Sequence, residues 1–347
     1  MVVFGCELLT RGYSVELIVA NLEGALQEII PKELRIVDLR SSRMIHALPK
    51  LIKKLATEPP QAIFSTITHA NLVAACAARL TGLSARAVVR QSNSPLSEAR
   101  DTLGRKISHR LIPPVYRRAR AIIAVSDGVR DELTAMDSSL RPRIQVLPTP
   151  VLTDDLRTKG AEKPKHPWFE DRRAPVIVSA GRLVESKGWI DLLRAHAQIR
   201  ARREAKLIII GEGSYRAALE AEVKRLGLQE DVALPGFQSN PFSFMNHANV
   251  FAFASHFEGL PNALVQAMSF GTPIVSTDCK SGPAEILEGG AWGTLVPVKD
   301  AGALAQAIER SLDLPKQRAA QLRAWERFGA AEATSGYLAA AGLPESV

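Results

Sequence analysis

The stretch "FAFASHFEGLPNALVQAMSFGTPIVS", residues 251–276, holds the pattern on which the fold prediction depends. An unbroken apolar run opens it and a second β-like run closes it. A helix-like segment lies between them and begins near Pro261, because proline is favoured in the first turn of a helix. Strand, helix and strand in this order predict a right-handed βαβ unit with parallel strands. Glu258 follows directly on the first strand, and polar Gln266 falls within the apolar helix.

The same alternation of strand-like and helix-like segments runs along the whole chain. The strand candidates of the first half are "YSVELIVA", "AIFST", "ARAVVRQ", "AIIAVS" and "RIQVLP". Those of the second half are "APVIVSAG", "AKLIIIGEG", "DVALPG", "NVFAFAS", "TPIVST" and "GTLVPV". Most are apolar throughout rather than at every second residue, which indicates sheets covered on both faces. The sequence therefore predicts an α/β protein with doubly wound parallel sheets.

The length of 347 residues favours two domains. Residues 149–175 are rich in proline and charge and poor in periodicity, so we place the boundary there. The expected segments are an N-terminal Rossmann-like domain (1–150), a linker (151–173), a second domain (174–324) and closing helices (325–347). Two doubly wound domains imply a cleft, with ligands at the carboxyl ends of the strands.

The chain opens on a helical pattern, "MVVFGCELLTRG", in which Gly12 can end the helix. A doubly wound domain normally has a strand and a glycine-rich turn before its first helix. Neither is visible, so we expect the first strand to be missing from this sequence.

Composition places the chain among soluble globular proteins, with 46% hydrophobic and 23% charged residues. We see no apolar run of the roughly 20 residues that span a bilayer and no leader pattern, so we expect a cytoplasmic protein. Cys6, Cys76 and Cys279 lack metal or disulfide spacing, which fits a reducing compartment. Each is interpreted as a small buried hydrophobe.

The net charge of +8 favours an anionic partner. Much of the basic charge lies in residues 100–120, "RDTLGRKISHRLIPPVYRRAR". Three interpretations stay open: a solvated helix face, a contact with an anionic inner membrane leaflet, and a nucleic-acid surface. The alternation of basic with aliphatic residues favours the membrane over nucleic acid, because only 5% of residues are aromatic.

Three features carry candidate chemistry. Arg182 and Lys187, between a strand and the next helix, form a candidate anion site or else surface cations at a helix cap. Gly211 and Gly213 allow a tight turn, with or without a ligand against it. Glu258 either caps the helix that follows or grips hydroxyl groups of a ligand whose anionic group lies on the helix amides.

Residues 236–287 resemble the donor-binding region of retaining glycosyltransferase family 4, with "GRLVESKG" and "GEG" upstream at the family's spacing. The likeness covers nearly the whole chain, strongly in the second half and loosely in the first. It implies the GT-B architecture, in which two Rossmann-like domains face each other across a cleft and the C-terminal one holds the nucleotide sugar.

The resemblance implies a role for particular residues. Arg182 and Lys187 match the pair that grips the donor diphosphate, and Glu258 matches the first glutamate of the family's E-x7-E motif, which contacts the donor sugar. His69, in "STITHAN", matches a histidine that faces the reacting centre. The remaining substrate-binding assignments are Gly181, Gly211 and Gly213 in the loops; Gly259, Leu260 and Pro261 at the sugar; Asn262 and Ala263 at a phosphate; Gly236 and Phe237 at the nucleobase; and Gln266 at the ribose.

Two departures from the family pattern matter. Gln266 stands where the second glutamate of E-x7-E belongs, and an amide hydrogen-bonds a ribose without the strength of a charge. The family's first strand and glycine-rich loop are absent, which fits either a truncated sequence or a decayed enzyme.

The resulting hypothesis is a hexosyltransferase-type enzyme that moves a sugar from a nucleotide-diphosphate donor, with UDP favoured, to an acceptor hydroxyl with retention. Such relatives build lipopolysaccharide, capsule or other surface glycans, often on lipid-linked acceptors. We expect no metal and no cofactor, since the two cations take the metal's role. The alternatives are a catalytically impaired or truncated GT-B scaffold, a GT-B nucleotide-sugar epimerase, a nicotinamide oxidoreductase and a nucleic-acid binder. A G-x-G-x-x-G with a downstream acidic residue is not seen, which disfavours the oxidoreductase.

Overall fold

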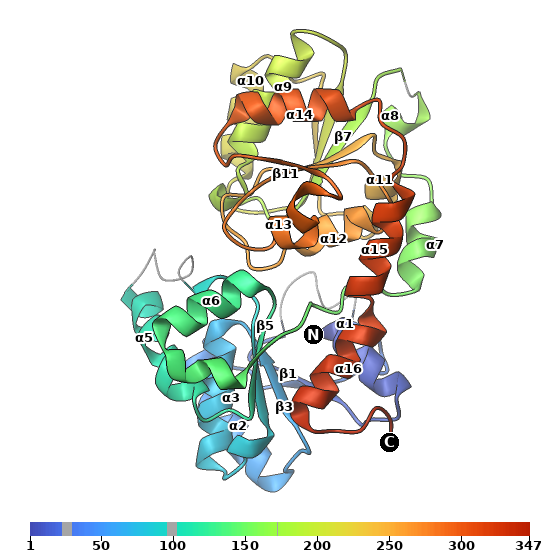
Figure 1. Cartoon of the computed structure of the whole chain (residues 1–347). Coiled ribbons are helices and arrows are strands. Elements are labelled where there is room, and N and C mark those ends of the chain that lie inside the picture. Colours follow the sequence, from blue (N-terminus) through green and yellow to red (C-terminus); the bar gives the residue numbers. More distant parts are fainter. Residues whose placement is uncertain (23–29, 96–102, 172) are drawn as a thin grey trace. The chain divides into compact units, whose positions relative to one another are not determined.

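The computed structural model describes residues 1–22, 30–95, 103–171 and 173–347. They form two compact units, drawn in Figure 1. Unit 1 consists of Met1–Pro150 and Ala330–Val347, and unit 2 of Val151–Gly329. The chain therefore returns to its first unit at the last helix, and each unit is described by itself below.

Unit 2 is built on a six-stranded parallel sheet in the order β12-β11-β10-β7-β8-β9. All six strands predicted for the second half are present. Their bounds are β7 Val176–Ala180, β8 Lys206–Ile210, β9 Val232–Gly236, β10 Val250–Phe253, β11 Ile274–Thr277 and β12 Thr294–Val296. The order reverses between β7 and β10, which is the topological switch point of a doubly wound sheet.

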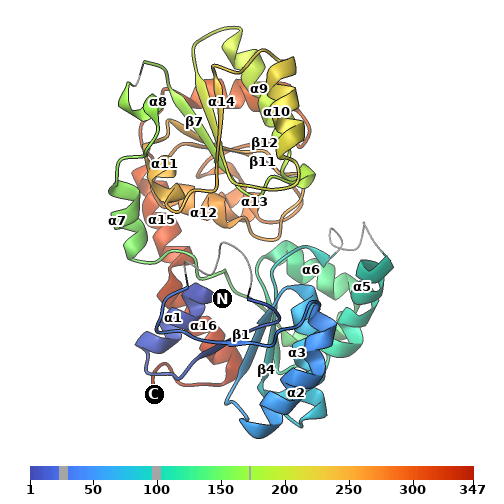
Figure 2. The ribbon, with the colours of Figure 1, turned by 180° about the vertical axis from the view of Figure 1, so that it is seen from behind.

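Helices cover both faces of this sheet (Figures 1 and 2). One group is α9 Trp189–Arg200, α10 Arg216–Arg225 and α14 Ala301–Ser311; the other is α11 Pro241–His247, α12 Asn262–Met268, α13 Pro283–Ile286 and α15 Arg318–Phe328. Val178 of β7 enters the core under the second group, and the adjacent Ile177 enters the core under the first. Because successive side chains alternate between two buried faces, most positions of the strands are apolar.

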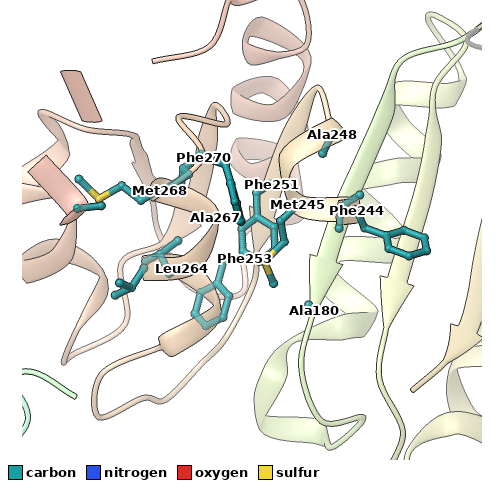
Figure 3. Packing of buried hydrophobic residues seen from close by; sticks show 14 of the residues in the cluster. Ala180, Phe244, Met245, Ala248, Phe251, Phe253, Leu264, Ala267, Met268 and Phe270 are labelled. Atoms are coloured by element: carbon teal, nitrogen blue, oxygen red, sulfur yellow. The ribbon is translucent and has the colours of Figure 1, made fainter. Parts of the chain in front are cut away.

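Figure 3 shows the core between β10 and the second helix group. Phe251 and Phe253 of β10 lie against Met245 of α11 and Leu264 of α12. This packing fixes the end of β10 relative to the start of α12. It therefore fixes the loop that carries Glu258.

Residues 151–173, expected as a linker, contain α7 Asp155–Ala161 and α8 Pro167–Glu170. Leu156 of α7 and Phe169 of α8 are buried in the core of unit 2. A Cβ on Gly160 would lie 2.3 Å from the Phe270 ring, so α7 packs closely against that unit. The two helices were not predicted, because they are short, expose most of their side chains and lie in a segment rich in proline and charge.

Unit 1 contains two separately paired parallel sheets. β1 Glu16–Val19 pairs with β2 Arg35–Asp38. The second sheet has the order β3-β4-β5-β6, with the bounds β3 Ile63–Thr66, β4 Ala87–Gln91, β5 Ala121–Ala124 and β6 Ile144–Val146. Strand β2 was not predicted, because its "RIVD" is too short and too polar to stand out from its surroundings.

In unit 1 too, helices lie on both sides of the sheets (Figure 2). α1 Val2–Thr10 and α16 Ala330–Ala341 pack together on one side, where Phe4 of α1 and Tyr337 of α16 join the same core. α2 Leu48–Thr57 and α3 Thr68–Leu80 lie on the other side, with α5 Leu103–Tyr116 against α3. α6 Asp127–Met136 precedes β6. The expected first helix is confirmed, with Arg11 as its C-cap and Gly12, at a φ of 87°, next in the chain.

His196 of α9 makes the stability of unit 2 depend on pH. The side chain is fully buried, and burial lowers the pKa of this histidine to about 4. Asp231 raises this pKa, while Arg200 and Lys206 lower it further. A histidine whose folded pKa is depressed stabilises the fold fully above its unfolded value of about 6.5, and that contribution is lost as the pH falls toward 4.

We therefore expect protonation linked to His196 to lower the free energy of unfolding by about 2 kcal/mol as the pH falls from about 7.5 to about 5. Denaturant unfolding of the wild type and of His196→Leu at both pH values measures this. Between these two pH values, the free energy of unfolding of the variant should fall by about 2 kcal/mol less than that of the wild type. His46→Leu, a change at an exposed histidine of unit 1, is the control. Equal pH dependence in the wild type and His196→Leu would contradict the expectation.

Candidate functional site at the carboxyl edge of the unit 2 sheet

Loops from neighbouring parallel strands meet at one edge of the unit 2 sheet. Gly181 follows β7, Gly211 follows β8, Phe237 follows β9 and the loop 254–261 follows β10. Because the strands are parallel, all these loops leave from their carboxyl ends at the same edge. The structure thus gathers the predicted site residues of the second half at the place where doubly wound sheets bind ligands.

The loop after β8 has glycine at positions 211 and 213 because the loop after β7 lies directly against its backbone. The Gly181 amide donates to Ile210 O at 3.0 Å, and the Leu183 amide donates to Glu212 O at 2.8 Å. A Cβ on Gly211 would lie 1.9 Å from Gly181 O, and one on Gly213 would lie 2.3 Å from Leu183 O. Close contact between two backbones therefore explains the Gly-x-Gly without any ligand.

Arg182 extends into solvent from this anchored loop. Its side chain is exposed, and within the described part of the chain it forms no ion pair. Its backbone is held, since Trp189 Nε1 donates to Arg182 O at 3.1 Å and the Trp189 ring is buried. A guanidinium that has a fixed backbone and no internal carboxylate partner is available to an anionic ligand.

Lys187 and Glu258 form an ion pair with each other. Lys187 Nζ lies 2.5 Å from Glu258 Oε1, and the two side chains are only 18% and 11% exposed. The ammonium also lies 5.6 Å from the centre of the Phe253 ring. Although Glu258 follows a strand end, its carboxylate is not exposed, because Lys187 binds and largely covers it.

A second contact joins the same two loops. The His256 amide donates to Ser186 O at 2.8 Å, and His256 Nε2 lies 2.6 Å from Asp191 Oδ2. Asp191 lies in the first turn of α9. Together with the Lys187–Glu258 pair, these bonds hold the β7 and β10 loops in one arrangement. The Asp191–His256 pair could not be found from the sequence, because its two members stand 65 residues apart and neither belongs to a recognised motif.

The loop that leads into α12 is well packed. Gly259 and Pro261 are buried, Leu260 is half-buried against the core, and Pro261 occupies the N-cap of α12 rather than its first turn. The next residue, Asn262, is exposed. The first amides of a helix have no acceptor within it, so those of Asn262 and Ala263 can meet a ligand.

Gln266 and Phe237 present free side chains near this edge. The Gln266 side chain is half-buried, and among the described residues its amide forms no hydrogen bond. Phe237 is 53% exposed directly after Gly236, whose φ is 80°. An exposed ring beside a strand end can stack on a planar group.

Cys279 is buried, as expected, whereas Cys6 and Cys76 are half-buried. Burial, and second the charge of Glu258, raises the pKa of Cys279 to about 12. The thiol is therefore protonated at neutral pH. Across the described residues, no group of three or more histidine, cysteine, aspartate or glutamate side chains is arranged to hold a metal ion.

His69 belongs to unit 1. It is exposed in the first turn of α3, and its Nδ1 is 3.2 Å from Ser108 Oγ of α5. The preceding Ile67 has a φ of 73°, which is rare for a β-branched residue. This strained turn presents His69 at the carboxyl end of β3.

Comparisons with known proteins assign both halves of the chain to one family. Residues 160–325 match the model for glycosyl transferases group 1, and residues 3–155 match the model for Glycosyltransferase Family 4.

Two relatives with known sequences illustrate the similarity. An uncharacterised glycosyltransferase of Methanocaldococcus jannaschii is 35% identical over 199 residues, which are 56% of this chain and 48% of that protein. N-acetylgalactosamine-N,N'-diacetylbacillosaminyl-diphospho-undecaprenol 4-alpha-N-acetylgalactosaminyltransferase of Campylobacter jejuni is 31% identical over 258 residues. That match covers 74% of this chain and 68% of the Campylobacter protein. The chain thus spans about half the length of the first relative.

Among solved structures, Anabaena HepE in complex with UDP and glucose superimposes with a TM-score of 0.81 at 18% identity. The match covers 97% of this chain and 94% of HepE. The predicted α/β fold of the GT-B type is confirmed, and the chain belongs to glycosyltransferase family 4.

Proposed function

We propose that the protein is a retaining glycosyltransferase that moves a sugar, most simply a hexose, from a UDP-sugar to an acceptor hydroxyl. The observation that carries the proposal is the cationic pair at the sheet edge. Arg182 is exposed and forms no ion pair with any described residue, and Lys187 lies in the loop that follows it. Family membership and the UDP and glucose bound by HepE favour the same chemistry.

In this proposal the two cations act on the leaving diphosphate. As the bond between the sugar and the diphosphate breaks, negative charge grows on the phosphate oxygen, and preorganised cations stabilise it. Arg182 offers a planar fork that can bind two phosphate oxygens at once. Lys187 adds a point charge from a loop that the hydrogen bonds to the β10 loop hold in place.

Glu258 has two tasks under this proposal. It holds Lys187 in position, because the ammonium is bound to its Oε1. Its other oxygen, Oε2, forms no ion pair within the described chain and can accept hydrogen bonds from sugar hydroxyls. The sugar would lie against the backbone of Gly259, Leu260 and Pro261, beside this second oxygen.

The remaining assignments complete the donor pocket. The amides of Asn262 and Ala263 would meet a phosphate, Gln266 the ribose, and Gly236 and Phe237 the base. The Gln266 amide is free to bind a ribose hydroxyl, although an uncharged acceptor makes a weaker hydrogen bond than a glutamate. His69, presented by unit 1, would face the reacting centre. Gly181, Gly211 and Gly213 act indirectly, by shaping the backbone that carries Arg182.

Retention would follow from attack on the face that the diphosphate leaves, with the departing phosphate oxygen taking the acceptor's proton. This chemistry asks the protein to position and to stabilise charge, and it assigns no residue as a covalent nucleophile. The cations take the role of a metal ion, so we propose a metal-independent reaction.

For the acceptor we propose a glycan or lipid-linked molecule of cell-surface glycan synthesis, handled at the inner face of the cytoplasmic membrane. The Campylobacter relative is named for a diphospho-undecaprenol acceptor. No helix within the described ranges is long and apolar enough to span a membrane.

An acceptor-free reaction tests the proposal. Many transferases slowly pass the sugar to water, so the chain is incubated with UDP-sugars in which the sugar is α-linked, and the released sugar is followed by proton NMR. We expect free UDP together with the α-anomer first, before mutarotation mixes the anomers. Release of the β-anomer would contradict retention. An epimerised sugar in place of hydrolysis would point to a nucleotide-sugar epimerase.

A further inference from the structure

Helix α5 (Leu103–Tyr116) presents large aliphatic side chains to solvent. Ile107 is 51% exposed and Leu111 is 46% exposed, and Pro114 is exposed on the same side. At 100° per residue these three positions fall within a sector of about 60°. Ile112 and Tyr116, on the opposite side, are buried and attach the helix to unit 1.

Basic side chains border this apolar stripe. Lys106 and Arg110 are exposed on the adjoining sector of α5, and within the described residues neither forms an ion pair. Arg117, one residue past the helix, differs because its Nε lies 2.6 Å from Asp137 Oδ2. The uncompensated positive charge therefore lies directly beside Ile107 and Leu111.

This arrangement fits a lipid surface better than the other two interpretations of residues 100–120. A helix face that only meets water carries polar residues, whereas this one carries Ile107, Leu111 and Pro114. A surface for single-stranded nucleic acid uses exposed aromatic rings for stacking, and the described exposed face of α5 has none. Helix α5 has a buried side, an aliphatic stripe and a flanking cationic stripe. These are the features of a helix that lies in a membrane interface.

We propose that α5 docks unit 1 on an anionic lipid bilayer. Ile107, Leu111 and Pro114 enter the boundary between headgroups and acyl chains, while Lys106 and Arg110 contact lipid phosphates. The helix remains attached to unit 1 through Ile112 and Tyr116, so it lies on the bilayer and does not cross it. Because α5 belongs to unit 1, the docking does not depend on the proposed donor site in unit 2.

Cosedimentation of the full chain with lipid vesicles tests the docking. With about one third of the lipid as phosphatidylglycerol, we expect binding that falls steeply in vesicles of phosphatidylcholine alone. Binding should also weaken at about 1 M salt, where charges are screened within about 3 Å. Absence of binding to the anionic vesicles at low salt would overturn the proposal.

Paired substitutions locate the surface. Ile107→Ser with Leu111→Ser should weaken vesicle binding roughly tenfold. Lys106→Glu with Arg110→Glu should weaken it at least about 25-fold. The matched controls are exposed residues of unit 2: Leu314→Ser with Leu322→Ser, which are 49% and 56% exposed, and Lys163→Glu with Lys165→Glu. Thermal unfolding and UDP binding should stay unchanged in the α5 variants.

Two results would overturn the proposal at this stage. Equal losses in the α5 variants and the controls would mean that general charge and hydrophobicity drive the binding. A loss in the charge variant without any loss in Ile107→Ser with Leu111→Ser would mean that the helix does not insert. Failure of UDP binding in the unmodified chain would bear on the donor site and leave the vesicle result intact.

Discussion

Arg182→Ala is expected to lower the turnover of the enzyme by about 10²- to 10³-fold, the usual cost of removing one preorganised group that stabilises transition-state charge. The side chain is exposed and has no ion-pair partner in the described chain, so its removal leaves no buried charge behind. Stability should therefore remain unchanged. Steady-state hydrolysis or transfer measured beside thermal unfolding separates the two quantities.

The control for Arg182→Ala is Lys224→Ala, which removes an exposed cation from α10. This variant should keep wild-type turnover. Wild-type turnover in Arg182→Ala, or an equal loss in the control, would remove the basis for placing the diphosphate at this loop.

Lys187→Ala is expected to lower turnover by a similar 10²- to 10³-fold and, in addition, to destabilise unit 2 by about 2 kcal/mol. The second effect arises because Glu258, which is 11% exposed, loses the ammonium that compensates its charge. Fully buried pairs lose more when one partner is removed, and the remaining solvent contact reduces the cost here. Denaturant unfolding and activity measurements on the same preparation give both values.

A double variant separates stability from catalysis. Lys187→Met with Glu258→Gln removes both charges and should regain most of the lost stability, because no unpaired charge remains. Turnover should stay low, since neither the cation nor the carboxylate is restored. Recovery of turnover in the double variant would show that the pair serves only to hold the two loops together.

The strands of unit 2 could be predicted because their physical signature is local. Ile177 and Val178 enter opposite cores, so β7 is covered on both faces, is mostly apolar and can be recognised in the sequence. Strand β2 escaped prediction because it is short and bears charged residues at both ends. Helices α7 and α8 escaped for a related reason, since each buries only a few residues such as Leu156 and Phe169.

The site was only partly predictable, because its decisive contacts join residues far apart in the chain. Motif resemblance singled out Lys187 and Glu258 separately, yet nothing local indicates that they bind each other across 71 positions. The same holds for Asp191 and His256. The need for glycine at position 211 also became clear only from the fold, because a carbonyl oxygen of the neighbouring loop leaves no room there for a side chain.

We propose above all that Arg182 and the loops around it bind the diphosphate of a nucleotide sugar. Calorimetric titration of the chain with UDP, GDP and ADP, repeated on Arg182→Ala, tests it most directly. We predict that UDP binds in preference to the other two and that Arg182→Ala binds UDP about tenfold more weakly or worse, as expected for a lost charge-assisted contact. Absence of binding to all three, or equal affinity in Arg182→Ala and the wild type, would contradict it.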